Sequence, residues 1–230
     1  MGTDNRTDGR PLEDLTARAR IRDAALAQFA EHGFKSATMK GVAQAAGYST
    51  GLVQHHFGSK EGLRRACDAH VAESLGDLDT YGVDDGKITD PDFMSDLYAK
   101  SPLIIRYVAR AMVEDSPAAA SLFDSGAAAA ERFLTGSWPE RFPPGSDRAR
   151  DGASVMAAMH MSTIALHAHL SRRMGADVLD GRNAPRIAMA MFDVYASMAE
   201  FTASDTGAGI RDAVAEQQSS GSPDEEHRDE

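Results

Sequence analysis

The chain has 230 residues, of which 42% are hydrophobic and 26% charged, and it carries a formal net charge of −11 and a single cysteine. This composition is ordinary for a soluble globular protein with one large or two small domains. It excludes an internal disulfide, and no apolar run approaches the roughly 20 residues of a transmembrane helix, so we expect a cytoplasmic protein with no membrane partner.

The charge is distributed unevenly along the chain. Residues 17–70 contain eight Lys or Arg against four Asp or Glu, whereas residues 71–230 contain 14 against 27. A basic segment in an otherwise acidic chain favours contact between that segment and a polyanion, while the rest of the chain is repelled by it.

The chain begins with a polar tail and a long helix. Residues 1–14 are polar and charged without a periodic apolar stripe, which predicts a disordered tail. A helix is predicted over residues 16–32, because Ile21 and Phe29 share one apolar face and Gly33 follows as a helix end.

The next segment predicts two short helices joined by a tight turn. Thr38 can cap the first helix, and Gly47 can adopt the left-handed conformation that turns the chain sharply. Ser49 can cap a second helix over residues 50–56. Helices this short are marginal alone in water, so they must pack on their neighbours. This pattern, with a polar outer face on the second helix, is typical of a DNA-binding helix-turn-helix.

Many residues at fixed spacing across this segment match one known family. They are Ile21 to Ala25, Phe29, Gly33, Phe34, Thr38, Val42, Ala43, Ala46, Gly47, Ser49, Gly51, His56, Phe57 and Ser59 to Glu61. With them, residues 18–63 resemble the amino-terminal domain of the TetR family of transcriptional regulators. Family members usually carry a phosphate-contacting tyrosine where this chain has Gln54, and a small aliphatic residue where it has Tyr48. An amide can still donate to a phosphate or read adenine, and we expect Tyr48 to pack.

The rest of the chain is also predicted to be helical. Chain-breaking residues mark a loop within 82–91 and a long connection over 136–145. Helices are expected over residues 60–78, 92–99, 102–115, 118–134, 148–174, 186–203 and, weakly, 210–218. The fold class is therefore all-α. We expect a disordered tail at 1–14, a three-helix DNA-binding domain at 15–75 with its motif at 38–57, a larger effector-binding and dimerisation domain at 76–218, and a disordered acidic tail at 219–230.

Two long helices near the carboxyl end, 148–174 and 186–203, are apolar on more than one face. A helix that is apolar nearly all round is buried nearly all round. One face can enter the subunit's own core, while the other packs on the same pair from a second chain as a four-helix bundle. The family resemblance implies the same homodimer, and a monomer that covers both faces itself is the alternative.

The resemblance implies a sequence-specific transcriptional regulator, most simply a repressor. It would bind a near-palindromic double-stranded DNA operator and leave it when a partly apolar small-molecule effector binds. A helical ligand-binding or interaction module without DNA activity is the alternative. An enzyme is not expected, because the sequence has no phosphate-cradling glycine loop after a strand, no nucleophile elbow and no metal-binding histidine pair.

Nine residues are predicted to contact DNA. Thr38, Lys60 and the amides at their helix starts would hold phosphates, while the second helix reads bases. Leu52 suits a thymine methyl, with packing on the first helix as the alternative, and Lys40 suits a phosphate, with a solvated lysine as the alternative. The set is Thr38, Lys40, Ser49, Thr50, Gly51, Leu52, Gln54, His55 and Lys60.

Candidate effector contacts come from polar and aromatic residues of the later helices. They are Arg106, Tyr107, Trp138, His160 and His167, each with a core or surface role as the alternative. The histidine spacing does not bring two rings to one ion, so no metal and no cofactor are expected.

Overall fold

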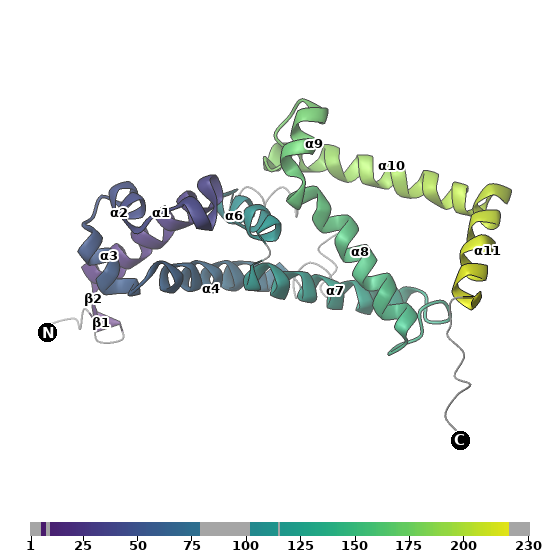
Figure 1. Ribbon diagram of the computed structural model, residues 1–230, viewed down its shortest axis with the longest axis horizontal. Helices are drawn as coiled ribbons and strands as arrows, with labels where there is room; N and C mark the ends of the chain where they lie inside the picture. The colour runs from purple at the N-terminus through teal and green to yellow at the C-terminus, as the bar shows by residue number, and fades with distance from the viewer. Residues whose placement is uncertain (1–5, 8–9, 79–101, 115, 221–230) are drawn as a thin grey trace, which may run out of the picture. The chain divides into compact units, whose positions relative to one another are not determined.

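The computed structural model describes residues 6–7, 10–78, 102–114 and 116–220. The chain divides into two compact units, Met1–Ala184 and Pro185–Glu230. The first unit opens with an antiparallel pair of two-residue strands, β1 (Arg6–Thr7) and β2 (Arg10–Pro11). The helices are α1 (Leu12–Ser36), α2 (Met39–Ala46), α3 (Thr50–Phe57), α4 (Lys60–Leu78), α6 (Pro102–Val113), α7 (Pro117–Ser137), α8 (Asp147–Ala165), α9 (His167–Met174), the 3-10 helix η3 (Gly181–Asn183), α10 (Ala184–Ala203) and α11 (Asp205–Ser220) (Figure 1).

Helix α1 is longer than the sequence predicts, but it is interrupted where the sequence predicts its end. It begins at Leu12, and the strand pair precedes it within the stretch expected to be a disordered tail. Gly33 has φ 76° and ψ 162°, a backbone conformation that is essentially restricted to glycine. The helix proper therefore stops there, and the last residues of α1 form a separate turn.

The main core lies among α1, α2, α3, α4 and α6. Ile21 and Phe29 of α1, Val53 of α3 and Leu63 of α4 are almost completely buried, and Tyr107 of α6 belongs to the same cluster. The two short helices are thus braced by α1 and α4, as their length requires. The core continues into α6, which packs on α1, so the helix-turn-helix segment shares its interior with the helices that follow.

Helices α7 and α8 pack along each other and form a smaller core. It contains Ala130, Leu134 and Ala153, with Phe142 and Met156 packed at its edge. The helices predicted over 102–115 and 118–134 correspond to α6 and α7. The predicted helix at 92–99 and the predicted loop within 82–91 lie outside the described residues.

The single helix predicted over 148–174 is wrong, because the chain breaks between α8 and α9. Leu166 joins them with φ −98° and ψ 19°. Just before this point, Ser162 Oγ donates to the carbonyl of Met159 (2.8 Å), and Thr163 Oγ1 donates to that of His160 (2.7 Å). Hydroxyls that bond to carbonyls of the preceding turn weaken and bend helices. The predicted apolar stripe therefore does not continue along one axis into α9.

The second unit holds most of α10 together with α11, which covers the weak helix expected over 210–218. Helix α10 is rich in large apolar side chains that remain exposed. They are Met189, Phe192, Val194, Met198 and Phe201. Among the described residues, no helix is both long and apolar enough to cross a bilayer.

Candidate nucleic-acid interface

The two short helices are held in place by caps at both ends. Thr38 Oγ1 accepts a hydrogen bond from the amide of Gly41 (3.0 Å), and Ser49 Oγ accepts one from Leu52 (3.2 Å). Gly47 closes α2 in the left-handed conformation, with φ 77° and ψ 29°. Ser59 caps α4 in the same way, through the amide of Gly62 (3.0 Å). The caps predicted at Thr38 and Ser49 and the turn predicted at Gly47 are all present, and the helix-turn-helix geometry follows from them.

Helix α3 has one buried face and one open face. Val53 and Phe57 point into the main core, while Gly51, Gln54 and His55 are exposed. The open face carries an amide and an imidazole, both of which can donate to or accept from base edges. Thr50 lies half-exposed at the first position of the helix, beside its exposed cap Ser49. The predicted base-reading residues are therefore together on one surface.

Leu52 differs from the other predicted reading residues. It is half-buried and packs against the main core, as do Met39 of α2 and Tyr48 of the turn. Leu52 therefore packs with part of its side chain, as the alternative predicts, while the rest of the side chain remains accessible. Tyr48 packs as predicted, and the guanidinium of Arg20 lies 5.3 Å from its ring centroid.

Lys60 is engaged within the chain. Its Nζ donates to the carbonyl of Lys35 (3.1 Å) and lies 4.6 Å from the ring centroid of Phe34. The guanidinium of Arg64 lies 4.7 Å from the same ring. The ring of Phe34 therefore lies close to two cations of α4, each of which a ring face stabilises. Lys40, by contrast, is exposed at the start of α2, next to Thr38.

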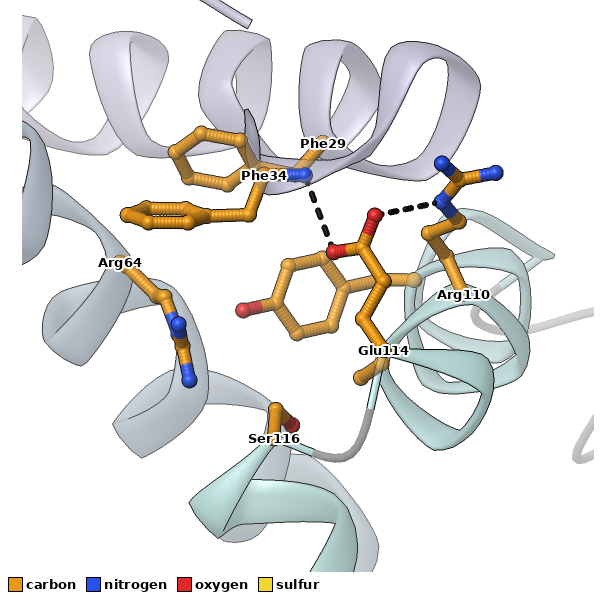
Figure 2. A pocket seen from close by; sticks show the side chains of 8 residues that line it. Phe29, Phe34, Arg64, Arg110, Glu114 and Ser116 are labelled. Carbon is orange, nitrogen blue, oxygen red and sulfur yellow. Dashed lines mark hydrogen bonds and ion pairs between the residues drawn. The ribbon is translucent and has the colours of Figure 1, made fainter. Parts of the chain in front are cut away.

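A second junction links the end of α1 to α6 (Figure 2). The amide of Phe34 donates to Glu114 Oε2 (3.0 Å), and Arg110 Nε donates to Glu114 Oε1 (2.9 Å). A carboxylate that accepts from both sides holds the turn after Gly33 against α6. Sequence reasoning missed Glu114, because its partner is 80 residues away.

The predicted effector residues do not gather at one site. Tyr107 is buried and donates from its hydroxyl to Asp68 Oδ1 (2.5 Å), and it lines a cavity of about 410 Å³ among α4, α6, α7 and α8. Arg106 instead forms an ion pair with Asp177 at the surface. His160 contacts the backbone carbonyl of Met156 in its own helix, and His167 contacts that of Ile164 at the end of α8. Trp138 is half exposed against Phe133. Of the five, Tyr107 alone lines this cavity.

The cavity is lined mainly by residues that the sequence did not single out. Apolar side chains dominate, and polar groups come from Asp68, Tyr107, Ser121 and Ser125. Burial and the hydrogen bond to Asp68 raise the pKa of Tyr107, so its hydroxyl remains a donor at neutral pH. An apolar space with few polar groups is the usual character of a small-molecule site.

The single cysteine is part of the core and has no reactive role here. Cys67 Sγ is buried and lies 3.7 Å from the carbonyl of Arg22, to which it can donate. Burial, reinforced by Asp68, raises the pKa of this thiol to about 12. Within the described part of the chain, no group of three His, Cys, Asp or Glu could hold a metal ion.

Residues 21–67, which span α1 to α4, match the family model described as bacterial regulatory proteins, tetR family. The amino-terminal domain belongs to the TetR family. The caps at Thr38, Ser49 and Ser59 and the turn at Gly47 all lie within the residues that match this family.

Curated relatives of this chain are named as transcriptional regulators. The regulatory protein RaaS of Mycobacterium tuberculosis is 42% identical over 53% of this chain and 57% of its own length. The repressor AcnR of Corynebacterium efficiens is 35% identical over 34% of this chain and 44% of its own length. The chain therefore matches less than two thirds of either relative.

Among solved structures, the chain is similar to the TetR family repressor AlkX from Dietzia sp. strain DQ12-45-1b. The identity is 22%, the match covers 65% of this chain and 83% of the other, and the TM-score is 0.34. The family assignment accordingly rests on the sequence matches.

Proposed function

We propose that this protein is a sequence-specific DNA-binding transcriptional regulator, most simply a repressor. The observation that carries the proposal is the open polar face of α3, presented by capped helices within a TetR-family domain. Gln54 and His55 would read base edges in the major groove, and Gly51 would let the helix backbone approach the DNA closely.

Phosphate contacts would come from the start of α2. Thr38 and Lys40 are exposed there, where unpaired amides and the helix dipole favour an anion. Lys60 would add to the positive potential of this surface without holding a phosphate itself, because its ammonium donates to the Lys35 carbonyl and lies over the Phe34 ring. The excess of basic residues over residues 17–70 supports this orientation toward DNA.

We expect the protein to act as a homodimer through α8 and α10. Each helix, considered alone, leaves large apolar side chains exposed: Val155 and Met159 on α8, and Phe192 and Met198 on α10. Contiguous exposed apolar side chains of this size mark an interaction surface. A symmetric dimer would place two copies of α3 in successive major grooves, about 34–36 Å apart.

An effector in the cavity beside Tyr107 would regulate DNA binding. The cavity touches α4, which begins at the DNA-binding surface and continues into the core. A ligand that binds one arrangement of α4 better than another shifts the protein between states of different operator affinity. A ligand-binding module without DNA activity remains the competing proposal.

Selection of bound duplexes from a random DNA pool tests the proposed function. We expect a near-palindrome with half-sites about one helical turn apart. Repeating the selection with Gln54→Ala should change the preferred base at one position of each half-site, by about 1–3 kcal/mol of discrimination. Lys40→Ala is the control. It should lower the affinity for all DNA sequences alike and make that affinity less dependent on salt concentration. If no duplex is enriched at moderate salt, the module without DNA activity is the better description.

Gly51→Ala should separate DNA approach from folding. A Cβ at this position meets only Ser49 Oγ, at 3.9 Å, so the substitution fits the fold and should raise the free energy of unfolding by up to about 1 kcal/mol. The same methyl group would hold α3 away from the groove, and we expect about a tenfold loss of operator affinity.

The matched control for this variant is Gly136→Ala near the end of α7. A Cβ there meets nothing within 4 Å, so stability should again increase while operator affinity stays unchanged. Chemical denaturation and mobility-shift titration measure the two quantities. Unchanged operator affinity in Gly51→Ala would show that α3 does not approach the DNA through its first turn.

A further inference from the structure

The charge that lines the cavity among α4, α6, α7 and α8 is negative. Of the described residues that line it, Asp68 is the only one with a charged side chain. Most of the others are alanine, leucine, valine or methionine, with two serine hydroxyls. An anionic ligand would lose its hydration here, gain no cation from the wall and be repelled by the carboxylate.

Asp68 also retains capacity to bind a further group. Its Oδ1 accepts from the Tyr107 hydroxyl at 2.5 Å, while Arg64 Nε lies 3.7 Å from its Oδ2, an ion pair longer than a hydrogen bond. An ionised carboxylate can accept about four hydrogen bonds. The aromatic ring of Tyr107 lines the same cavity, and a ring face beside a carboxylate is a favourable environment for an organic cation.

We propose that this cavity binds an organic cation with an apolar body, with the Asp68 carboxylate as its counter-ion and the Tyr107 ring beside it. The apolar body occupies the space lined by Leu75, Leu122 and Met161, which bring α4, α7 and α8 together around it. Burial of an organic cation is favourable here because a fixed carboxylate replaces part of its hydration.

The position of Asp68 also suggests how the ligand acts on DNA binding, a step that rests on the proposed function. Asp68 pairs with Arg64, and Arg64 lies over Phe34. The Phe34 amide is bonded to Glu114, and its ring is also covered by Lys60 at the start of α4. A cation bound to Asp68 would compete with Arg64 for the carboxylate. Loss of this ion pair would free Arg64 to leave the Phe34 ring and would weaken the contact of α4 with the turn at the end of α1.

Calorimetric titration of the full-length protein with tetraphenylphosphonium tests the proposal. Tetraphenylborate, which has the same shape and the opposite charge, is the matched ligand control. We expect the cation to bind and the anion to bind at least about tenfold more weakly. Asp68→Asn keeps an oxygen that can accept from Tyr107 but removes the negative charge. It should lower the affinity for the cation by about tenfold. Asp177→Asn removes a surface carboxylate outside the cavity and should leave the affinity unchanged.

Circular dichroism establishes that each variant is folded. If Asp68→Asn is not folded, Ser125→Phe fills the cavity while keeping the carboxylate, and it should abolish binding of the cation. No binding of the cation to the wild type, equal affinity for both ions, or unchanged affinity in the cavity variant overturns the proposal. Failure of the ligand-free protein to bind any selected duplex counts against the proposed function alone, since calorimetry needs no DNA.

Discussion

Phe192→Asp should convert the protein from a dimer to a monomer and lower its operator affinity by at least about 100-fold. Phe192 is 67% exposed on α10, among other large apolar side chains that a partner would cover. A carboxylate buried there without a counter-ion would be costly enough to prevent association. Once the two half-sites are bound independently, the gain from linking two reading helices is lost.

Sedimentation and mobility-shift titration on the selected duplex measure the two effects. Val113→Asp provides the control, because Val113 is 64% exposed at the end of α6, which is not one of the proposed interface helices. It should leave both mass and affinity unchanged. A Phe192→Asp protein that stays dimeric with wild-type affinity would rule out α10 as the interface.

Gly33→Ala should lower the free energy of unfolding by about 3 kcal/mol. The conformation of Gly33, φ 76° and ψ 162°, is strained for any residue with a Cβ. A Cβ would also lie 2.3 Å from both Arg110 Nη2 and Glu114 Oε1, so the side chains that anchor the Phe34 amide would have to move. Strain and loss of the junction therefore act together.

Gly47→Ala is the control, because it lacks both causes. Gly47 has almost the same φ, 77°, but its ψ of 29° is the ordinary left-handed conformation, and a Cβ meets nothing within 4 Å. Its cost should be only about 1 kcal/mol. Urea denaturation followed by circular dichroism gives both values. Equal losses in the two variants would mean that neither the contacts nor the particular backbone conformation of Gly33 adds to the cost.

The sequence predicted what depends on neighbouring residues. The caps at Thr38 and Ser49 are each made to an amide three residues along the chain, so spacing alone identifies them. The turn at Gly47 and the end of regular helix at Gly33 follow from one residue's conformational freedom. The polar face of α3 was predicted from sequence spacing, because the helical period decides which side chains lie on the same face.

Features that depend on distant contacts were predicted less well. The cavity is formed where four helices meet, and among the predicted effector residues only Tyr107 lines it. Lys60 was expected to hold phosphate from its place at a helix start, but its ammonium meets Phe34 and the Lys35 carbonyl, which no local pattern reveals. The break at Leu166 was not predicted, because the apolar stripe runs across it and the carbonyl bonds of the Ser162 and Thr163 hydroxyls are seen only in the structure.

The buried thiol of Cys67 leaves an introduced cysteine as a specific labelling position, with which the proposed motion of α3 can be measured. Only the thiolate reacts with alkylating reagents, and a pKa of about 12 keeps this sulfur protonated in neutral buffer. A cysteine introduced at Gln54, which is exposed on α3, would therefore be the single modifiable position in each subunit. In the proposed dimer, paired spin labels at that position would report, by pulsed electron paramagnetic resonance, the distance between the two copies of α3 with and without a ligand.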